Sequence, residues 1–310
     1  MEHLELLFII FGVIMTTLGF LFIYTMVSMC SPENHELYKN VHKTHDIHDI
    51  HNTHSKYNIH DKYHYNNDTQ YINNINKHQK PIYCLMVTGK DDDRYKFAQA
   101  SIINFLLQTY QNKYLVILNH GDEEIYTRYN NRIKEIRVFK EGKTLGELRN
   151  MSLKYVPYGA IFTTWDDDDW RSNDYLETLY KILISTKSDV VMIRNRISYN
   201  LNNHSMWKET LNSGFVHFFM YIDPMVEYAR LDTLEDQKVK DYVHKHKKVY
   251  IYDNDPKMYI RNIHKNNTSP YVNKKKAAVN EWLKGEYKEA ELGLTDRRYA
   301  MNIYRQYYSF

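Results

Sequence analysis

Cysteine is scarce in this chain of 310 residues, and several common catalytic signatures are absent. Only Cys30 and Cys84 occur, so no disulfide framework is expected to hold the fold together. The chain contains no Gly-x-Gly-x-x-Gly and no Gly-x-Ser-x-Gly. Arg137 stands where a P-loop ending at 142–144 needs its first glycine. The sequence therefore gives no support to a dinucleotide fingerprint, a serine nucleophile elbow or a P-loop.

An excess of either charge is also missing. Lys and Arg total 41 against 38 for Asp and Glu, which gives a formal net charge of +3. Nucleic-acid-binding domains usually carry a clear basic bias, so we expect no nucleic-acid partner. The length suits one sizeable domain with extra segments, or two small domains.

The longest apolar run covers residues 7–29 and contains no charged side chain. A helix of this length spans the hydrocarbon core of a bilayer. A cleaved signal peptide is the alternative, but Glu2 and Glu5 stand where such a peptide carries basic residues. We therefore expect a short tail at 1–6 and a single-pass membrane anchor at 7–29.

The side of the membrane on which the remaining chain lies is left open by the sequence. Lysines follow the apolar run and none precede it, which favours a cytoplasmic domain, although the nearest, Lys39, is ten residues away. The 29 tyrosines are typical of an AT-rich genome. If that genome is viral, the membrane is the host's.

Residues 30–79 form a His- and Asn-rich low-complexity linker. Histidine recurs at every third position from 42 to 54, a spacing that fits neither a helical stripe nor a zinc finger. Two interpretations remain. The segment is a disordered tether, or its imidazoles bind Zn²⁺ or Ni²⁺ weakly.

Apolar runs and helical patterns alternate from residue 80 onward. The sequence predicts buried strands at 81–88, 114–118, 133–139, 160–164 and 189–193, and helices at 95–107, 144–155 and 174–184. This alternation predicts an α/β fold with a mostly parallel sheet flanked by helices. Ligands of such sheets bind at the carboxyl ends of the strands, where Thr88, Asn119 and Asp166 fall.

Four adjacent aspartates, 166–169, lie between Trp165 and Trp170 directly after the predicted strand 160–164. Their mutual repulsion is costly unless a cation or solvent offsets it. Carboxylates at a strand end are the hard oxygen ligands that Mg²⁺ and Mn²⁺ prefer. A solvated acidic loop is the alternative, but such loops usually contain Gly, Ser, Pro or Lys. We therefore predict a site for Mn²⁺ or Mg²⁺ at this turn.

Five segments occur in a recognisable order between residues 80 and 270. They are the strand–helix–strand unit 81–121, the Gly…Arg-Asn element 146–150, the aspartates 165–170, the Glu-Asp pair 235–236 and the Tyr…His…Asn-Thr segment 259–268. Together they resemble the family 2, GT-A-type glycosyltransferases. The resemblance implies a GT-A-like nucleotide-diphospho-sugar transferase fold, with a catalytic domain at 80–272. The helical pattern that follows predicts a C-terminal helical extension at 273–310, packed on the domain or lying on a membrane surface.

The resemblance also implies roles for individual residues. The metal would be held by Asp166 and Asp168, which face the site from alternate positions, and by His264 as a third ligand. His264 could instead contact the diphosphate, or simply cap or pack. A divalent cation there offsets the charge of a departing diphosphate. Asp169 is expected to bond to the backbone of the following turn. The donor-binding residues would be Thr88, His120, Arg149, Asp166 and Asp167, the last of these on the ribose.

Asp236 is the predicted general base for the acceptor hydroxyl, and Glu235 is expected to position or tune it. The alternative for this pair is an acid-rich first turn of a helix. The family inverts the anomeric centre by direct displacement, so no covalent nucleophile is needed. The Gln-x-x-Arg-Trp motif of its processive members is absent, which favours single additions.

One position departs from the family. His120 stands where an aspartate usually accepts a hydrogen bond from the nucleotide base. A neutral imidazole has one acceptor nitrogen and could do the same, or the change could mark another nucleotide. A UDP-sugar is the donor that the resemblance favours, and the acceptor stays open.

The sequence as a whole predicts a membrane-anchored, metal-dependent, inverting, non-processive glycosyltransferase. Two alternatives remain. One is a catalytically silent, membrane-tethered binding protein, in which the aspartates are a structural remnant. The other is a metal-dependent phosphoryl-transfer enzyme that uses the aspartate cluster.

Overall fold

The computed structural model describes residues 79–89, 92–126, 130–139, 142–265 and 287–308. The predicted tail, the membrane anchor and all but the last residue of the linker lie outside these residues. No helix in the described part of the chain is long and apolar enough to cross a membrane.

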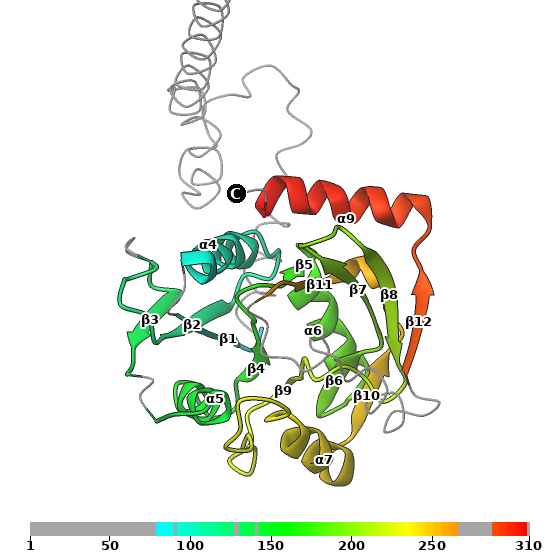
Figure 1. The fold of residues 1–310 in the computed structure, drawn as a ribbon. Coiled ribbons are helices and arrows are strands. Elements are labelled where there is room, and N and C mark those ends of the chain that lie inside the picture. The colour runs from blue at the N-terminus through cyan, green and yellow to red at the C-terminus, as the bar shows by residue number, and fades with distance from the viewer. Residues whose placement is uncertain (1–78, 90–91, 127–129, 140–141, 266–286, 309–310) are drawn as a thin grey trace, which may run out of the picture. The chain divides into compact units, whose positions relative to one another are not determined.

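A seven-stranded sheet forms the centre of the described fold (Figure 1). Its strands are β1 (Ile82–Thr88), β2 (Lys113–Asn119), β3 (Ile133–Arg137), β4 (Ile161–Thr164), β6 (Val190–Ile193), β9 (Phe219–Tyr221) and β10 (Val249–Tyr252). They lie in the order β10-β6-β9-β4-β1-β2-β3. All neighbours are parallel except β9, which is antiparallel to β4 and β6. The predicted α/β class with a mostly parallel sheet is thus confirmed.

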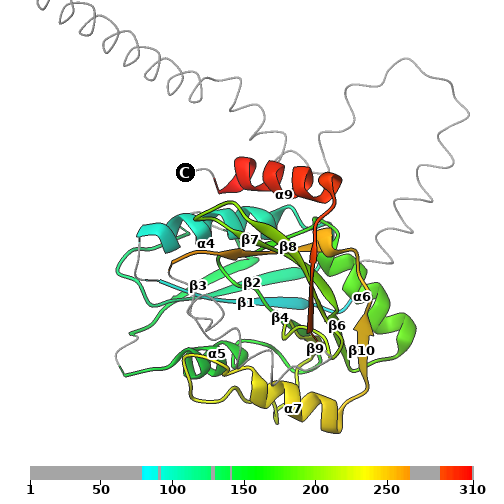
Figure 2. The same ribbon diagram turned by 45° about the vertical axis from the view of Figure 1, so that its right-hand side comes forward.

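Helices cover both faces of this sheet (Figure 2). They are α4 (Asp92–Leu106), α5 (Leu145–Leu153), α6 (Tyr175–Thr186) and α7 (Gln237–His246). One apolar cluster joins alternate β1 side chains to α4 and α6, and a second joins the opposite face to α5 and α7. Side chains along a strand point alternately to the two faces of the sheet. A strand that is apolar at nearly every position is therefore buried on both faces of the sheet. The strands and helices predicted between 81 and 193 all occur within a few residues of their expected bounds.

A smaller, five-stranded sheet completes the domain. Its strands are β5 (Trp170–Arg171), β7 (Asn195–Asn200), β8 (Met206–Leu211), β11 (Tyr259–Ile263) and β12 (Tyr287–Glu291), in the order β12-β8-β7-β11-β5. A 3₁₀ turn, η2 (Pro256–Met258), precedes β11, and helix α9 (Leu294–Tyr307) follows β12. Because β5 directly follows the aspartates and pairs with β11, this sheet fixes the far side of their turn.

The C-terminal segment differs from its prediction. A helical extension was expected over 273–310, but Tyr287–Glu291 form strand β12, antiparallel to β8. The edge of β8 offers unpaired backbone groups, and pairing with them outweighs the local preference of these residues for helix. Helix α9 does form, and the buried Ala300 within it, together with Leu292 before it and Tyr308 after it, packs on the domain.

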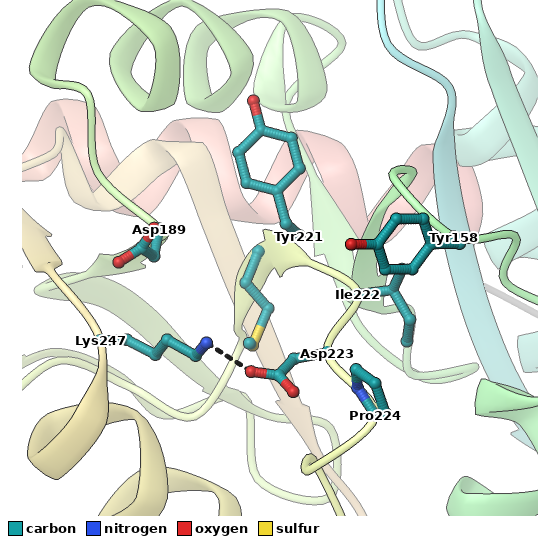
Figure 3. Close-up of a pocket in the computed structure, with 8 residues that line it drawn as sticks. Tyr158, Asp189, Tyr221, Ile222, Asp223, Pro224 and Lys247 are labelled. Carbon is teal, nitrogen blue, oxygen red and sulfur yellow. Dashed lines mark ion pairs between the residues drawn. The ribbon is translucent and has the colours of Figure 1, made fainter.

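A surface cavity of about 280 Å³ lies at the amino ends of the parallel strands (Figure 3). Tyr158, Asp189 and Lys247 line it from just before β4, β6 and β10. Lys247 forms an ion pair with Asp223 (Figure 3), and the Tyr242 hydroxyl donates to the same carboxylate at 2.8 Å. These charges balance one another within the domain, and the aspartate turn lies at the opposite edge of the sheet.

Candidate functional site

The four aspartates form a turn between β4 and β5, at the carboxyl end of β4. Strand β4 ends at Thr164, so the aspartates follow the strand and do not extend it. In the turn, three of the four aspartates are buried, and the Asp166 side chain is 25% exposed. Thr88 is buried at the end of the neighbouring strand β1. This edge of the sheet is where ligands of α/β proteins bind.

Guanidinium groups offset much of the negative charge of the turn. Arg149 Nη2 lies 2.9 Å from Asp166 Oδ1, and Arg94 Nη1 lies 2.6 Å from Asp167 Oδ1. A third arginine, Arg171, is fully buried and stacks 4.2 Å from the Trp165 ring centroid. The repulsion that predicted a bound cation is therefore reduced by side chains of the protein itself.

The pKa values of the first two aspartates move in opposite directions. Burial raises the pKa of Asp167 to about 6, and the nearby Arg94 opposes that shift. Burial also raises the pKa of Asp166, but the nearby cationic groups, Arg149 foremost, together outweigh burial and hold the pKa of Asp166 below its usual value. Asp166 is thus the firmly ionised member of this pair, and Asp167 titrates nearer to neutrality.

Asp169 ties the turn to β11. Its carboxylate accepts a hydrogen bond from the Tyr259 hydroxyl at 2.6 Å and from the Asn262 backbone N–H at 3.0 Å. Burial raises the pKa of Asp169 to about 7. The expected bond to the following turn is wrong, because the partners come from a strand about 90 residues later in the chain. Asp169 thus has a structural role.

Asp168 and His264 come together as predicted. His264 Nε2 lies 3.0 Å from Asp168 Oδ2, and the Asn262 side-chain amide donates to the Asp168 carbonyl at 2.6 Å. Neighbouring ligands of an octahedral ion bound at about 2.1 Å lie about 3 Å apart. The two side chains share a hydrogen bond in this structure, and the same spacing would suit two adjacent ligands of one Mn²⁺ or Mg²⁺ ion.

The third predicted metal ligand, Asp166, is engaged elsewhere. It pairs with Arg149, and His217 Nδ1 lies 3.8 Å from its other oxygen. Within the described ranges, no group of three or more His, Cys, Asp or Glu side chains is arranged to hold a metal. A magnesium-type ion often takes only one or two protein ligands and completes its shell with water and substrate phosphates, so two ligands are compatible with such a site.

The predicted general base lies at the start of α7. Asp236 occupies the N-cap position, but its side chain makes no capping hydrogen bond. Burial raises the pKa of Asp236, with Arg149 opposing the shift. Leu234, two residues earlier, has a φ of 61°, a strained conformation for a residue with a branched side chain. The Glu-Asp pair 235–236 thus lies at the start of α7, a position that fits both the predicted base and the alternative of an acid-rich first helix turn.

Arg149 connects the loop that carries the predicted base to the aspartate turn. Its Nε lies 3.0 Å from Glu235 Oε1, and its Nη2 contacts Asp166 at 2.9 Å. The sequence predicted a nucleotide contact for Arg149, whereas the structure shows it spanning two carboxylates that are 69 positions apart. Glu235 is 5% exposed, and its ion pair with Arg149 holds it next to Asp236 in the chain.

Helix α5 also holds the loop that carries the base. The Asn150 side chain donates to the Tyr228 carbonyl at 2.9 Å and accepts from the Tyr228 N–H at 2.7 Å. The Gly146 N–H donates to the Leu231 carbonyl at 3.0 Å. The Gly…Arg-Asn element thus acts as a clamp on residues 228–236. The motif spacing predicted this element, but not the contact of Asn150.

Gly146 is expected to tolerate no side chain. A Cβ added there would lie 1.7 Å from the Ala229 carbonyl oxygen. We expect Gly146→Ser to destabilise the domain by about 1–3 kcal/mol, because the base loop must move away from α5. Urea unfolding of the two proteins measures this loss.

The matched control for that variant is Gly293→Ser. Gly293 is the N-cap of α9, and an added Cβ meets nothing within 4 Å. Serine is favoured at an N-cap, so the control should keep or slightly gain stability. Equal stability of both variants would contradict the proposed clamp.

The remaining predicted donor residues lie at the ends of β1 and β2. The His120 N–H donates to the Thr88 carbonyl at 2.9 Å. Gly89 has a φ of 146°, and a Cβ there would lie 2.4 Å from the Gly121 nitrogen. A glycine at 89 therefore lets these two strand ends approach closely, and it brings Thr88 and His120 to one edge of the site.

Sequence reasoning missed two further residues beside the aspartates. Arg94 directly follows three aspartates in the sequence. Within this run of charged residues, nothing marks Arg94 as a contact of the distant aspartate turn. His217 has no local signal at all. Its ring stacks 4.2 Å from the Tyr259 ring, and burial holds the pKa of His217 well below its usual value, so the imidazole is neutral.

Part of the chain is similar in sequence to a known protein. No family model matches the chain. Glycosyltransferase GlyA of Streptococcus pneumoniae is 31% identical over 119 residues, which cover 36% of this chain. This match confirms the resemblance to a glycosyltransferase. It spans only 16% of that relative's length.

Solved structures of S. aureus TarS are also similar in outline. The complex with UDP gives a TM-score of 0.48 at 14% identity, over 59% of this chain and 60% of that one. The complex with UDP-GlcNAc gives a TM-score of 0.49 at 14% identity, over 61% and 60%.

Proposed function

We propose that this chain is a GT-A-like glycosyltransferase that moves a sugar from a nucleotide-sugar donor to an acceptor hydroxyl. One observation carries the proposal. Arg149 joins the base loop to the aspartate turn, with contacts of 3.0 Å to Glu235 and 2.9 Å to Asp166. A base for the acceptor and a cluster of carboxylates for the donor are thus held at fixed positions beside each other. The sequence match to a glycosyltransferase supports the same activity.

The metal site would consist of Asp168 and His264, whose facing atoms are 3.0 Å apart. A Mn²⁺ or Mg²⁺ ion bound there supplies positive charge to the departing diphosphate. The chain's own residues hold the site in shape. Asn262 fixes the backbone of the turn at Asp168, and Asp169 fixes it to Tyr259. Thr88 and His120 lie at the neighbouring strand ends, where the nucleotide would bind.

The chemistry at the acceptor is a direct displacement. The acceptor oxygen forms a bond to the anomeric carbon as the bond from that carbon to the diphosphate oxygen breaks, so the configuration inverts. The acceptor proton passes to Asp236. Burial raises the pKa of this carboxylate, which improves it as a base at neutral pH as long as it stays ionised. Glu235, held by Arg149, keeps the loop in position.

The remaining features extend the same proposal. A single-pass anchor at 7–29 would tether the enzyme to a membrane, and the linker would separate the domain from it. A UDP-sugar is the favoured donor, with His120 in place of the family's aspartate. The absent Gln-x-x-Arg-Trp motif favours one addition per encounter.

Donor binding tests the proposal most simply. Purified full-length protein is screened with nucleotide sugars by thermal shift in the presence and absence of Mn²⁺. At about 100 times its Kd, a bound donor should raise Tm by roughly 5–10 °C. The shift should need Mn²⁺ and disappear in Asp168→Ala.

The matched control is Asp241→Ala, which removes an exposed carboxylate from α7 and should keep the donor-induced shift. A well-folded protein that no nucleotide sugar stabilises would overturn the proposal. That result would favour a catalytically silent binding protein.

A further inference from the structure

Arg94 places a positive charge on the carboxylates that the donor site would use. Its Nη1 lies 2.6 Å from Asp167 Oδ1 and 3.8 Å from Asp168 Oδ2. The Arg94 side chain is 18% exposed and that of Asp167 only 2%. Water therefore screens this pair less than a surface ion pair. A guanidinium also stays charged at every physiological pH, so this cation is permanent.

The same oxygen of Asp168 faces two different groups. His264 Nε2 lies 3.0 Å from Asp168 Oδ2, and Arg94 Nη1 lies 3.8 Å from it. This oxygen and His264 form the pair whose spacing fits a divalent ion. An ion bound to it would therefore stand beside the Arg94 guanidinium, and charges of the same sign repel. Arg94 in its observed position and a metal at Asp168 oppose each other.

A nucleoside diphosphate would remove that conflict. Its phosphate oxygens carry negative charge that offsets both cations, and a guanidinium binds phosphate through a fork of two N–H groups. Arg94 lies in the first turn of α4, which follows the carboxyl end of β1. This is the edge of the sheet at which the donor would bind, so the phosphates would lie within reach of it.

We propose that Arg94 is the resident cation of the aspartate turn and a contact for the donor diphosphate. It weakens metal binding to the free protein, and it pairs with the diphosphate when donor and metal are both bound. Metal and nucleotide then strengthen each other's binding by equal factors, as linkage requires. This inference rests on the proposed function and adds a donor-binding residue to it.

The test is Mn²⁺ binding to the purified full-length protein, followed by the electron paramagnetic resonance signal of free Mn²⁺. In Arg94→Met, the Kd for Mn²⁺ without nucleotide should fall about tenfold, because the repelling charge is gone. Addition of UDP should tighten Mn²⁺ binding less in this variant than in the wild type. This readout does not depend on transfer activity.

Two matched variants test whether the effect on Mn²⁺ binding comes from the charge of the Arg94 side chain or from its shape and position. Arg94→Lys keeps the charge and should bind Mn²⁺ as weakly as the wild type does. Lys96→Met removes an exposed cation from the same helix and should change the Kd by less than about twofold. If Arg94→Met does not fold, Arg94→Gln removes the same charge and is expected to give the same tightening.

The Kd for Mn²⁺ and the binding of nucleotide sugars together distinguish failure of this proposal from failure of the proposed function. An unchanged or higher Kd for Mn²⁺ in the folded neutral variants overturns the role of Arg94, and donor binding by the wild type then leaves the proposed function standing. If the wild type binds neither Mn²⁺ nor any nucleotide sugar, both proposals fail.

Discussion

Replacing Asp236 by asparagine is expected to lower the kcat of sugar transfer by about 10²–10⁴-fold. The amide has nearly the same shape as the carboxylate but cannot accept the acceptor's proton. Because the Asp236 side chain makes no capping bond to α7, the fold should survive the change. Donor binding should stay within about threefold of the wild type, since Asp236 is assigned to the acceptor side. Steady-state kinetics and thermal shift on both proteins measure these two effects.

The pH dependence of kcat tests the same assignment. Only the ionised carboxylate is a base, so kcat should rise as pH increases through the pKa of Asp236. Burial raises that pKa above its usual value, although Arg149 opposes the shift. The acid limb should therefore lie at a higher pH than for an ordinary aspartate, and it should vanish from the residual activity of Asp236→Asn.

The control for Asp236 is another aspartate on the same helix. Asp241 is exposed on α7, and Asp241→Asn should keep both kcat and the acid limb. Wild-type kcat in Asp236→Asn would contradict the role of this residue as the base.

Removal of Arg149 is expected to have the largest effect on stability. Arg149→Met leaves the buried Glu235 and the partly buried Asp166 without their shared cation. Breaking a buried ion pair on one side typically costs 3–5 kcal/mol, so we expect a loss of about 3–5 kcal/mol in the free energy of unfolding. Denaturant titrations at pH 7 measure it.

A surface ion pair gives the comparison. Lys181 pairs with Glu177 at 2.6 Å, but its side chain is 71% exposed. Lys181→Met should therefore cost less than about 1 kcal/mol. Similar losses in the two variants would contradict a buried, bridging role for Arg149.

The sign of the pH effect gives a second check on Arg149. Burial raises the pKa of Asp166, but Arg149 and the other nearby cations together lower that pKa below its usual value in the folded protein. A carboxyl with a lowered folded pKa contributes stability above its unfolded pKa, and this contribution is lost as pH falls through the folded value. The stability gap between wild type and Arg149→Met should therefore shrink as the pH falls below about 4.

The central sheet could be predicted because its signals are local. Apolar runs such as 114–118 are hydrophobic enough to be buried on both faces, and helical spacing separates them. The aspartate turn followed from adjacency in the sequence, and the closeness of His264 to Asp168 followed from the order of the resembling segments. Strand β12 was missed because its pairing depends on the free edge of β8, which lies about 80 residues earlier.

The electrostatics of the site could not be predicted in the same way. Arg94 and Arg149 reach Asp167 and Asp166 from two helices on opposite faces of the sheet. Side-chain pairs of this kind depend on tertiary packing, and the sequence carries no periodic trace of them. The sequence therefore predicted that the aspartates need positive charge, but not that arginines supply part of it.

Release of nucleoside diphosphate is the measurement that tests the enzyme most directly. Full-length wild type and Asp236→Asn are incubated with Mn²⁺ and each of a panel of nucleotide sugars, together with a mixture of candidate acceptors. We predict release from one donor by the wild type, and release at least about a hundredfold slower by Asp236→Asn. Equal release by both proteins, or none from a donor that binds, would contradict a glycosyltransferase that uses Asp236 as its base.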